Sequence, residues 1–127
     1  MAIISLLISL ICIPFSAYAA LPTTIIKSCY DGDTCTTIDG EKIRLACIDT
    51  PELKGKKANP IRAKEARDFL NNLVMNKEVY IKRITKDRYE RTVAELFIND
   101  LNIQEIIVKK GYGKIYQKYA SQCSWSK

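Results

Sequence analysis

The chain has 127 residues, with 20 Lys and Arg against 14 Asp and Glu, five cysteines and no histidine. This length suits a single domain, and the lack of histidine excludes hydrolases that use an imidazole base, such as the Ser-His-Asp and Cys-His types. The net charge of +6 favours a polyanionic partner such as nucleic acid. A generic basic exported protein would carry the same charge.

The N-terminal segment has the pattern of a secretion signal. The first 26 residues carry no charged side chain, and residues 3–15 form an apolar run that is too short to span a bilayer. Ala17 and Ala19 give the small-x-small spacing of a signal-peptidase site. We therefore expect a signal peptide over residues 1–19 and a secreted or periplasmic domain over 20–127, without stable membrane association. A buried N-terminal strand or an uncleaved anchor is the alternative.

Five later segments have the composition or the alternation of β-strands. They are residues 23–30, 34–38, 41–48, 78–84 and 91–98. Asp39-Gly40 is a two-residue hairpin signal between the second and third strands. Asn99-Asp100 closes the fifth strand with a turn.

Two helices are expected between and after these strands. Asn59-Pro60 is a strong helix start, with Asn as the cap and Pro in the first turn, and this helix ends near Asn76. Asn102 caps a shorter helix through its Asn-x-x-Glu spacing to Glu105, and Gly111 suits the C-terminal cap. The order of three strands, helix, two strands and helix indicates an α+β, mainly β class, with a small closed five-stranded barrel of the OB type.

Acidic residues near predicted strand ends are candidate metal ligands. Asp33 and Asp49 could bind a hard cation such as calcium together with the carbonyl oxygen of Thr50. Glu52, just beyond a proline, could orient or deprotonate a water molecule. The alternative is that these acids only form turns and solvate loops.

Basic and aromatic residues supply candidate contacts to a nucleic acid. Arg44 and Arg91 could clamp a phosphate through two parallel hydrogen bonds, although an arginine on a strand more commonly forms a surface ion pair. Tyrosines alternate with basic residues in the second half of the chain, a mixture that stacks bases and follows phosphates but also packs barrel rims. These residues are Arg88, Tyr89, Tyr112, Lys114, Tyr116, Lys118 and Tyr119.

Four motifs follow one another along the chain. They are Asp31-Gly32-Asp33-Thr34, then Arg44-Leu45-x-x-Ile48-Asp49-Thr50-Pro51-Glu52, then Asp87-x-Tyr89-x-Arg91, and Gly111 before an aromatic tail. In order and spacing, residues 25–119 resemble the staphylococcal nuclease (thermonuclease) family. The resemblance implies a five-stranded OB barrel with helices, and a calcium-dependent endonuclease that acts on DNA and RNA and leaves 3′-phosphates.

The resemblance also implies a role for each matching acid. Asp33 and Asp49 would be side-chain ligands of one calcium ion, and Thr50 would add its carbonyl oxygen. Glu52 would hold and activate the attacking water.

The matching basic and aromatic residues would hold the substrate, single-stranded or double-stranded DNA or RNA. Arg44 and Arg91 would bind the scissile phosphate and the charge that builds on it. Four residues would lie around the nucleotide, namely Asp87, Arg88, Tyr89 and Tyr119. The protein is expected to act as a monomer.

The sequence departs from the family pattern at three places. Glu90 stands where glycine is usual, so that a positive φ there would strain the backbone or rebuild the turn. Gln117 aligns with one of two tail tyrosines of the family, and Tyr116 is the candidate replacement. The third, C-terminal helix of the family is expected to be missing, because the sequence stops at Lys127.

Four of the five cysteines fall in the predicted mature domain, an even number that favours disulfides in an exported protein. Cys29 and Cys35 are symmetric about Gly32, so a tight hairpin would place them opposite each other. This leaves Cys47 to pair with Cys123 and to fasten the tail to the third strand. Four cysteines allow three pairings in all.

Two other functions would fit parts of this pattern. A non-catalytic OB-fold module would bind nucleic acid in a salt-dependent manner without cleaving it. The acids and both arginines argue against that alternative, because a pure binding module has no need of carboxylates that face phosphate. A basic exported protein that binds cell-surface polyanions would explain the charge and leave the motifs unexplained.

Overall fold

The computed structural model of the chain describes residues 3, 8–10 and 20–127. The predicted signal-peptidase site at Ala17 and Ala19 lies outside the described residues. Among the residues that are described, no helix is long and apolar enough to cross a membrane.

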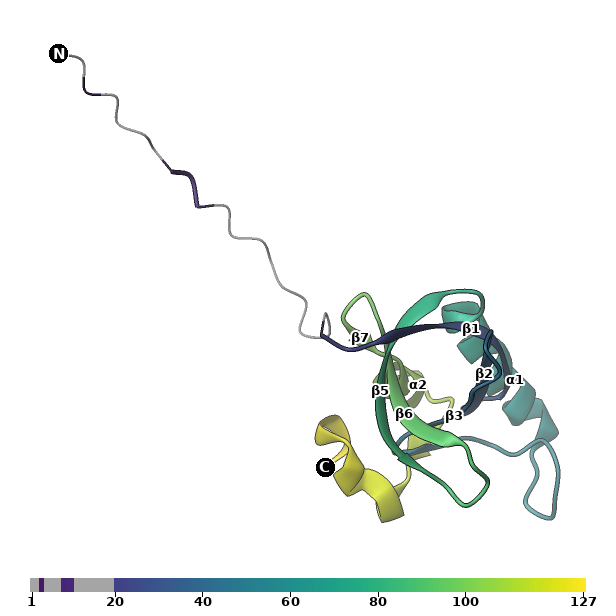
Figure 1. Ribbon diagram of the computed structural model, residues 1–127. Helices are drawn as coiled ribbons and strands as arrows, with labels where there is room; N and C mark the ends of the chain where they lie inside the picture. The colour runs from purple at the N-terminus through teal and green to yellow at the C-terminus, as the bar shows by residue number, and fades with distance from the viewer. Residues whose placement is uncertain (1–2, 4–7, 11–19) are drawn as a thin grey trace.

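Five strands close into a barrel, as the sequence predicts (Figure 1). The sheet has the order β3-β2-β1-β5-β6-β7, and a parallel pairing of β3 with β6 closes it. The barrel strands are β1 (Thr23–Asp31), β2 (Thr34–Thr37), β3 (Lys42–Leu45), β5 (Glu78–Lys86) and β6 (Thr92–Ile98). The short β7 (Leu101–Asn102) extends the sheet beside β6.

Two helices cover the barrel and begin at the predicted caps. The Asn59 side chain accepts a hydrogen bond from the Arg62 N–H at the start of α1 (Pro60–Val74). Asn102 does the same for the Glu105 N–H at the start of α2 (Ile103–Lys109). Gly111 has a φ of 81° just after α2, the left-handed conformation that suits glycine at this cap.

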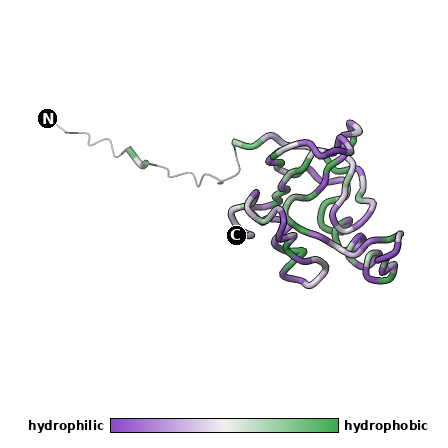
Figure 2. Tube along the Cα trace, turned by 90° about the horizontal axis from the view of Figure 1, so that it is seen from below, coloured by the Kyte–Doolittle hydropathy of each residue, from purple (hydrophilic) through white to green (hydrophobic). Residues whose placement is uncertain are grey.

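Apolar side chains from the strands and from one face of α1 form the main core, and a second, smaller cluster contains Ala46, Cys47 and Cys123. Figure 2 shows hydrophobic and hydrophilic residues alternating along the chain trace, as expected of strands with one buried face. The largest fully buried side chains of the barrel include Ile26, Ile43, Leu45, Ile81 and Leu96. The α1 helix contributes Ala63, Ala66, Leu70 and Val74. This core fixes the strands that carry the candidate site.

The predicted strand over residues 41–48 is interrupted. The chain turns at Ala46 and Cys47, where Cys47 has a φ of 67°. The continuation, β4 (Ile48–Asp49), leaves the barrel and pairs with β8 (Lys114–Ile115) in a second, two-stranded sheet. The break turns Asp49 away from the barrel sheet.

The C-terminal segment forms two short 3₁₀ helices, η1 (Gln117–Gln122) and η2 (Ser124–Ser126), which the sequence pattern did not predict. They lie against the outside of the barrel near β5 and β6 (Figure 1). Both predicted disulfides are present, Cys29 with Cys35 and Cys47 with Cys123. The second disulfide joins the turn after β3 to this C-terminal segment.

Candidate active site

Barrel closure brings three predicted site residues together. In the parallel pairing, Arg44 on β3 lies opposite Val93 on β6, two residues after Arg91. On its other side β3 pairs with β2, where Thr34 lies opposite Arg44. Asp33 directly precedes Thr34. The strand order therefore places Arg44 between the predicted acid and the second predicted arginine.

Asp33 is buried, with 6% of its surface exposed. Its Oδ2 accepts a hydrogen bond from the Thr50 N–H at 3.1 Å and lies 3.4 Å from Arg44 Nη2. Burial raises the pKa of Asp33 to about 6, although the charge of Arg44 acts in the opposite direction, and the nearby Asp31 adds to the rise. A bound cation would stabilise the ionised form of this carboxyl, because positive charge lowers the pKa of adjacent acids.

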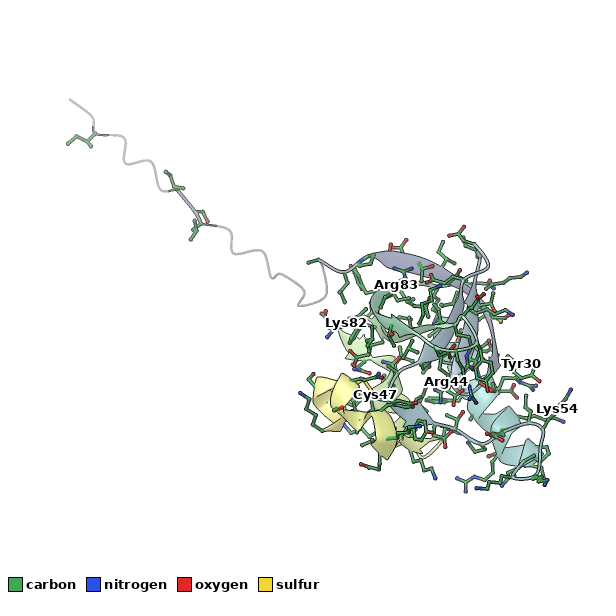
Figure 3. All side chains as sticks on the ribbon, turned by 60° about the horizontal axis from the view of Figure 1, so that its bottom comes forward. Tyr30, Arg44, Cys47, Lys54, Lys82 and Arg83 are labelled. Carbon is green, nitrogen blue, oxygen red and sulfur yellow. A yellow bond between two sulfur atoms is a disulfide. The ribbon has the colours of Figure 1, made fainter. Side chains whose placement is uncertain are left out.

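The Arg44 guanidinium has a fixed orientation. Its Nη1 donates to the Leu45 carbonyl at 2.7 Å, and its Nη2 donates to the Ile48 carbonyl at 3.0 Å. Figure 3 shows Arg44 between the part of the molecule near Cys47, which joins the C-terminal segment, and the loop that carries Lys54. These contacts hold the positive charge in place before any substrate binds.

The turn between β5 and β6 holds Arg91 in the same way. Asp87 Oδ2 accepts a hydrogen bond from Arg91 Nε at 2.7 Å, and its Oδ1 accepts from the backbone N–H groups of Tyr89 at 2.9 Å and Arg91 at 3.0 Å. Burial favours the neutral acid, but these hydrogen bonds and the charge of Arg91 outweigh it and lower the pKa of Asp87. Asp87 is therefore an ionised residue that positions Arg91.

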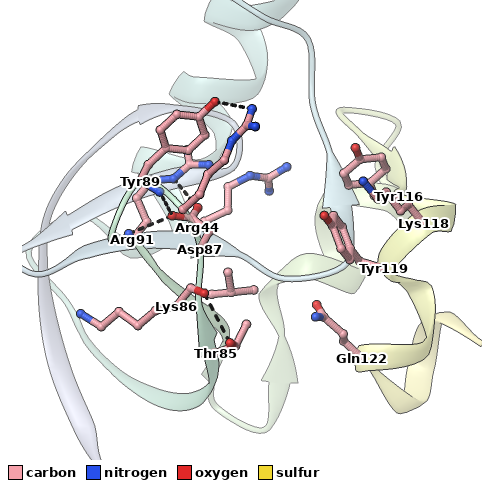
Figure 4. A pocket seen from close by; sticks show the side chains of 12 residues that line it. Arg44, Thr85, Lys86, Asp87, Tyr89, Arg91, Tyr116, Lys118, Tyr119 and Gln122 are labelled. Atoms are coloured by element: carbon pink, nitrogen blue, oxygen red, sulfur yellow. Dashed lines mark hydrogen bonds and ion pairs between the residues drawn. The ribbon is translucent and has the colours of Figure 1, made fainter.

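Both arginines line one cleft of about 500 Å³, which we call the arginine cleft. Figure 4 shows two walls that face each other across it. One wall carries Arg44, Asp87, Tyr89 and Arg91, and the other carries Tyr116, Lys118, Tyr119 and Gln122. Arg88 also lines the cleft and contacts Tyr89. The four residues predicted to surround the nucleotide all lie here, together with both predicted phosphate clamps.

Tyr89 presents an aromatic ring among positive charges at this cleft. The Arg88 guanidinium lies 4.9 Å from the ring centroid and donates to the Tyr89 hydroxyl at 2.7 Å. The Arg91 guanidinium lies 5.3 Å from the same centroid. Such a combination can stack a base while it binds a phosphate.

Some lining residues were missed or left open at the sequence level. Lys86 and Gln122 line the arginine cleft and were not predicted. The position of Lys86 beside the Asp87 motif could have indicated it, whereas no periodic signal marks Gln122. Gln117 does not line the cleft, whereas Tyr116 does.

Glu90 adopts a left-handed backbone conformation, with a φ of 63°. Glycine is usual at this position in the family pattern, and a positive φ is expected to strain the backbone there or to rebuild the turn. A residue with a Cβ atom pays about 1–2 kcal/mol for this conformation. The Asp87 hydrogen bonds keep the turn in place in spite of that cost.

We expect Glu90→Gly to raise the free energy of unfolding by up to about 1 kcal/mol. Glycine removes the strain of the left-handed conformation. This gain exceeds the roughly 0.4–1 kcal/mol by which the greater conformational entropy of glycine stabilises the unfolded chain. Urea denaturation measures the change. Asn76→Gly is the matched control, because Asn76 has a φ of 62° but asparagine tolerates this conformation. An equal or larger gain for the control would contradict the assignment of strain to Glu90.

The remaining predicted residues lie in a second cleft, which we call the glutamate cleft, of about 380 Å³. It is lined by Asp49, Thr50, Pro51, Glu52, Lys57, Arg62, Gly111, Tyr112, Gly113 and Lys114. The two clefts are neighbours, because the buried Asp33 contacts Arg44 of the arginine cleft and the Thr50 N–H of the glutamate cleft. Glu52 thus lines one cleft and the two arginines line the other, and Asp33 contacts residues of both.

The predicted metal ligands fit a hard cation that keeps several water molecules. Asp33 and Asp49 offer carboxylate oxygens and Thr50 offers a carbonyl, the ligand type that calcium and magnesium prefer. Among residues 3, 8–10 and 20–127, no group of three or more His, Cys, Asp and Glu side chains could hold a metal ion. Water or substrate oxygens would have to complete the coordination, as is usual for magnesium at phosphate-transfer sites.

Three contacts hold the C-terminal wall of the arginine cleft. The Cys47–Cys123 disulfide spans 76 residues, and the Tyr116 N–H donates to the Cys47 carbonyl at 2.9 Å. Beyond the wall, Trp125 Nε1 donates to Oε1 of the buried Glu95 at 2.8 Å. Because these contacts come from distant parts of the chain, the wall depends on tertiary structure rather than on local helix propensity.

Comparison with known proteins gives one consistent family. The model of the family described as "Staphylococcal nuclease homologue" matches residues 42–126. A Haemophilus influenzae protein named "Uncharacterized endonuclease" is 35% identical over 94 residues, which cover 71% of this chain and 50% of that protein. An Escherichia coli protein of the same name is 31% identical over 93 residues, 70% of this chain and 58% of that protein.

A plant relative shows the same similarity. The "Staphylococcal-like nuclease CAN1" of Arabidopsis thaliana is 35% identical over 86 residues, 68% of this chain and 25% of that protein. The chain spans about half the length of the bacterial relatives. The matched family region contains β3, the turn that holds Arg91 and the C-terminal wall. The chain belongs to the staphylococcal nuclease homologue family.

Proposed function

We propose that the protein is an exported, calcium-dependent endonuclease that hydrolyses phosphodiester bonds of DNA and RNA as a monomer. The observation that carries this proposal is the fixed placement of Arg44 and Arg91 in one cleft, with Asp33 in contact with Arg44. A module that only binds nucleic acid has no need of a buried acid beside its phosphate-binding arginine. The endonuclease and nuclease names of the relatives support the same reaction class.

Arg44 and Arg91 would bind the scissile phosphate and the charge that develops on it. Both guanidinium groups are held by protein acceptors before substrate binds, so little reorganisation is needed in the transition state. Tyr89 and Tyr119 on opposite walls would stack on the adjoining base.

Glu52 would orient the attacking water and accept its proton. Its side chain is exposed and lines the glutamate cleft, which leaves it free to contact water. Asp33, Asp49 and the Thr50 carbonyl would hold the calcium ion. The ion would contribute charge neutralisation and orientation of oxygen ligands.

Export is supported by two features. The apolar run at residues 3–15 and the Ala17-x-Ala19 pattern are those of a signal peptide. The two disulfides are of the kind that persists in oxidising compartments.

The test is incubation of the protein with single-stranded DNA and, separately, with single-stranded RNA, in calcium or in EGTA. We expect cleavage in calcium and a fall to the background rate in EGTA, with recovery when calcium is added back. Unchanged cleavage in EGTA would refute the calcium role. Salt-sensitive binding without cleavage in any metal would instead support the non-catalytic OB-fold module.

A further inference from the structure

Three cationic side chains from three separate elements converge on the glutamate cleft. Lys57 comes from the loop before α1, Arg62 from the first turn of α1, and Lys114 from β8. Within the described part of the chain, none of the three forms an ion pair closer than 4.0 Å, although Asp49 and Glu52 line the same cleft. The cleft therefore holds three unpaired positive charges against two negative ones.

Two of these cations are held on rigid supports. Lys114 lies directly opposite Asp49 in the β4–β8 pair. The preceding residue, Gly113, packs so closely that an added Cβ would lie 2.9 Å from Thr50 Cγ2 and 3.0 Å from the Asp49 carbonyl oxygen. Arg62 Nη2 donates to the Gly111 carbonyl at 3.4 Å, which ties the start of α1 to the end of α2. These contacts fix the backbone that carries Lys114 and one end of the Arg62 guanidinium, while both side chains are exposed to a ligand.

We propose that the glutamate cleft binds the phosphate next to the scissile one, so that the substrate is a polynucleotide that spans both clefts. This inference rests on the proposed function, because it takes the scissile phosphate to lie at Arg44 and Arg91. The two clefts are neighbours, because Asp33 Oδ2 accepts a hydrogen bond from the Thr50 N–H of the glutamate cleft and lies 3.4 Å from Arg44 Nη2 of the arginine cleft. A chain that leaves the scissile position would therefore meet the glutamate cleft next. Lys114 and Arg62 then contact the neighbouring phosphate.

The lining of the glutamate cleft suits a nucleotide better than an isolated anion. Pro51 and Tyr112 add apolar surface beside the cations. The Tyr112 ring is itself held by stacking on Phe69, with ring centroids 4.3 Å apart. A phosphate at Lys114 would therefore have surface nearby for its sugar or base. A cleft that bound only small inorganic anions would need no such wall.

The test is a cycle that combines one protein change with one substrate change. The protein change is Lys114→Gln, and the substrate is a short single-stranded oligonucleotide with an uncharged methylphosphonate on one side of a defined cleavage site. We expect each change alone to lower kcat/KM about tenfold, the size of one lost hydrogen bond between charged groups. When the methylphosphonate lies on one particular side of the cleavage site, both changes together should lower kcat/KM no further than either change alone. When it lies on the other side, the two effects should multiply. Arg62→Gln should show the same coupling.

Lys77→Gln is the matched control, because Lys77 is exposed and lines neither cleft. The fold-change in kcat/KM caused by Lys77→Gln should multiply with the fold-change caused by the methylphosphonate, on either side of the cleavage site. The proposal is overturned if Lys114→Gln and the methylphosphonate also multiply on both sides, or if Lys114→Gln lowers cleavage of a dinucleotide as much as that of the longer substrate. Failure of the unmodified protein to cleave any substrate would refute the proposed function instead.

Discussion

Replacing Arg91 with lysine is expected to lower kcat by about 10²–10³-fold, the effect of losing one fixed donor to a developing oxyanion. Lysine keeps the positive charge but loses the planar fork that binds two phosphate oxygens at once. It also loses the Nε–H that Asp87 accepts at 2.7 Å, so the remaining charge is no longer held in position. Single-turnover cleavage of an oligonucleotide in calcium measures the chemical step.

Arg83→Lys is the matched control for this change. Arg83 also lies near an acid, and its Nη2 and Nε donate to Glu41 at 2.7 and 2.9 Å, but it lines neither cleft. We expect kcat within about twofold of the unmodified protein, since exposed ion pairs contribute little even to stability. An equal loss of kcat in both variants would show that the change disturbs the barrel in general, and that the loss does not report a contact between Arg91 and the phosphate.

Local sequence signals predicted most of the fold. Asp39-Gly40, the Asn59 cap and the Asn102 cap each act within a few residues, and each lies where the sequence placed it. The placement of Arg44 near Arg91 is different, because it depends on a parallel pairing between strands that are about 50 residues apart in the chain. No periodicity encodes that closure, so the family resemblance was needed to join the two arginines in one site.

The features that the sequence missed depend on contacts between distant residues. The strand expected over 41–48 turns at Cys47, which is bonded to Cys123. The C-terminal segment has no apolar period, yet Trp125 is held by a hydrogen bond to buried Glu95. These interactions outweigh local propensity, and they define one wall of the arginine cleft. Hence Gln122 could not be recognised as a lining residue.

Glu52 and the two arginines line different clefts. The motif that contains Arg44 and Glu52 is continuous in sequence, but the turn at Cys47 and the departure of β4 place its two ends in different clefts. Asp33 contacts both sides. If the scissile phosphate binds at Arg44 and Arg91, the water at Glu52 would have to reach it from the neighbouring cleft.

Removing the Cys47–Cys123 disulfide, as Cys47→Ser with Cys123→Ser, is expected to lower the melting temperature by about 15 °C or more. In the chain-entropy model a bridge across its 76-residue separation stabilises by about 4.5 kcal/mol, and each kcal/mol corresponds to roughly 4–8 °C in a domain of this size. Differential scanning calorimetry measures the shift. The control pair is Cys29→Ser with Cys35→Ser, whose separation of 6 residues predicts only about half that loss.

The same variant should also bind substrate more weakly at temperatures where it remains folded. The disulfide fastens η1, which carries the tyrosine wall of the arginine cleft, to the turn that follows Arg44. Loss of one stacked base costs about 1–3 kcal/mol, so KM should rise roughly tenfold or more while kcat changes less. The Cys29–Cys35 control should leave KM near its original value, because that bridge touches neither wall. A fall in kcat at constant KM would show that the tail positions the catalytic arginines instead of the nucleotide.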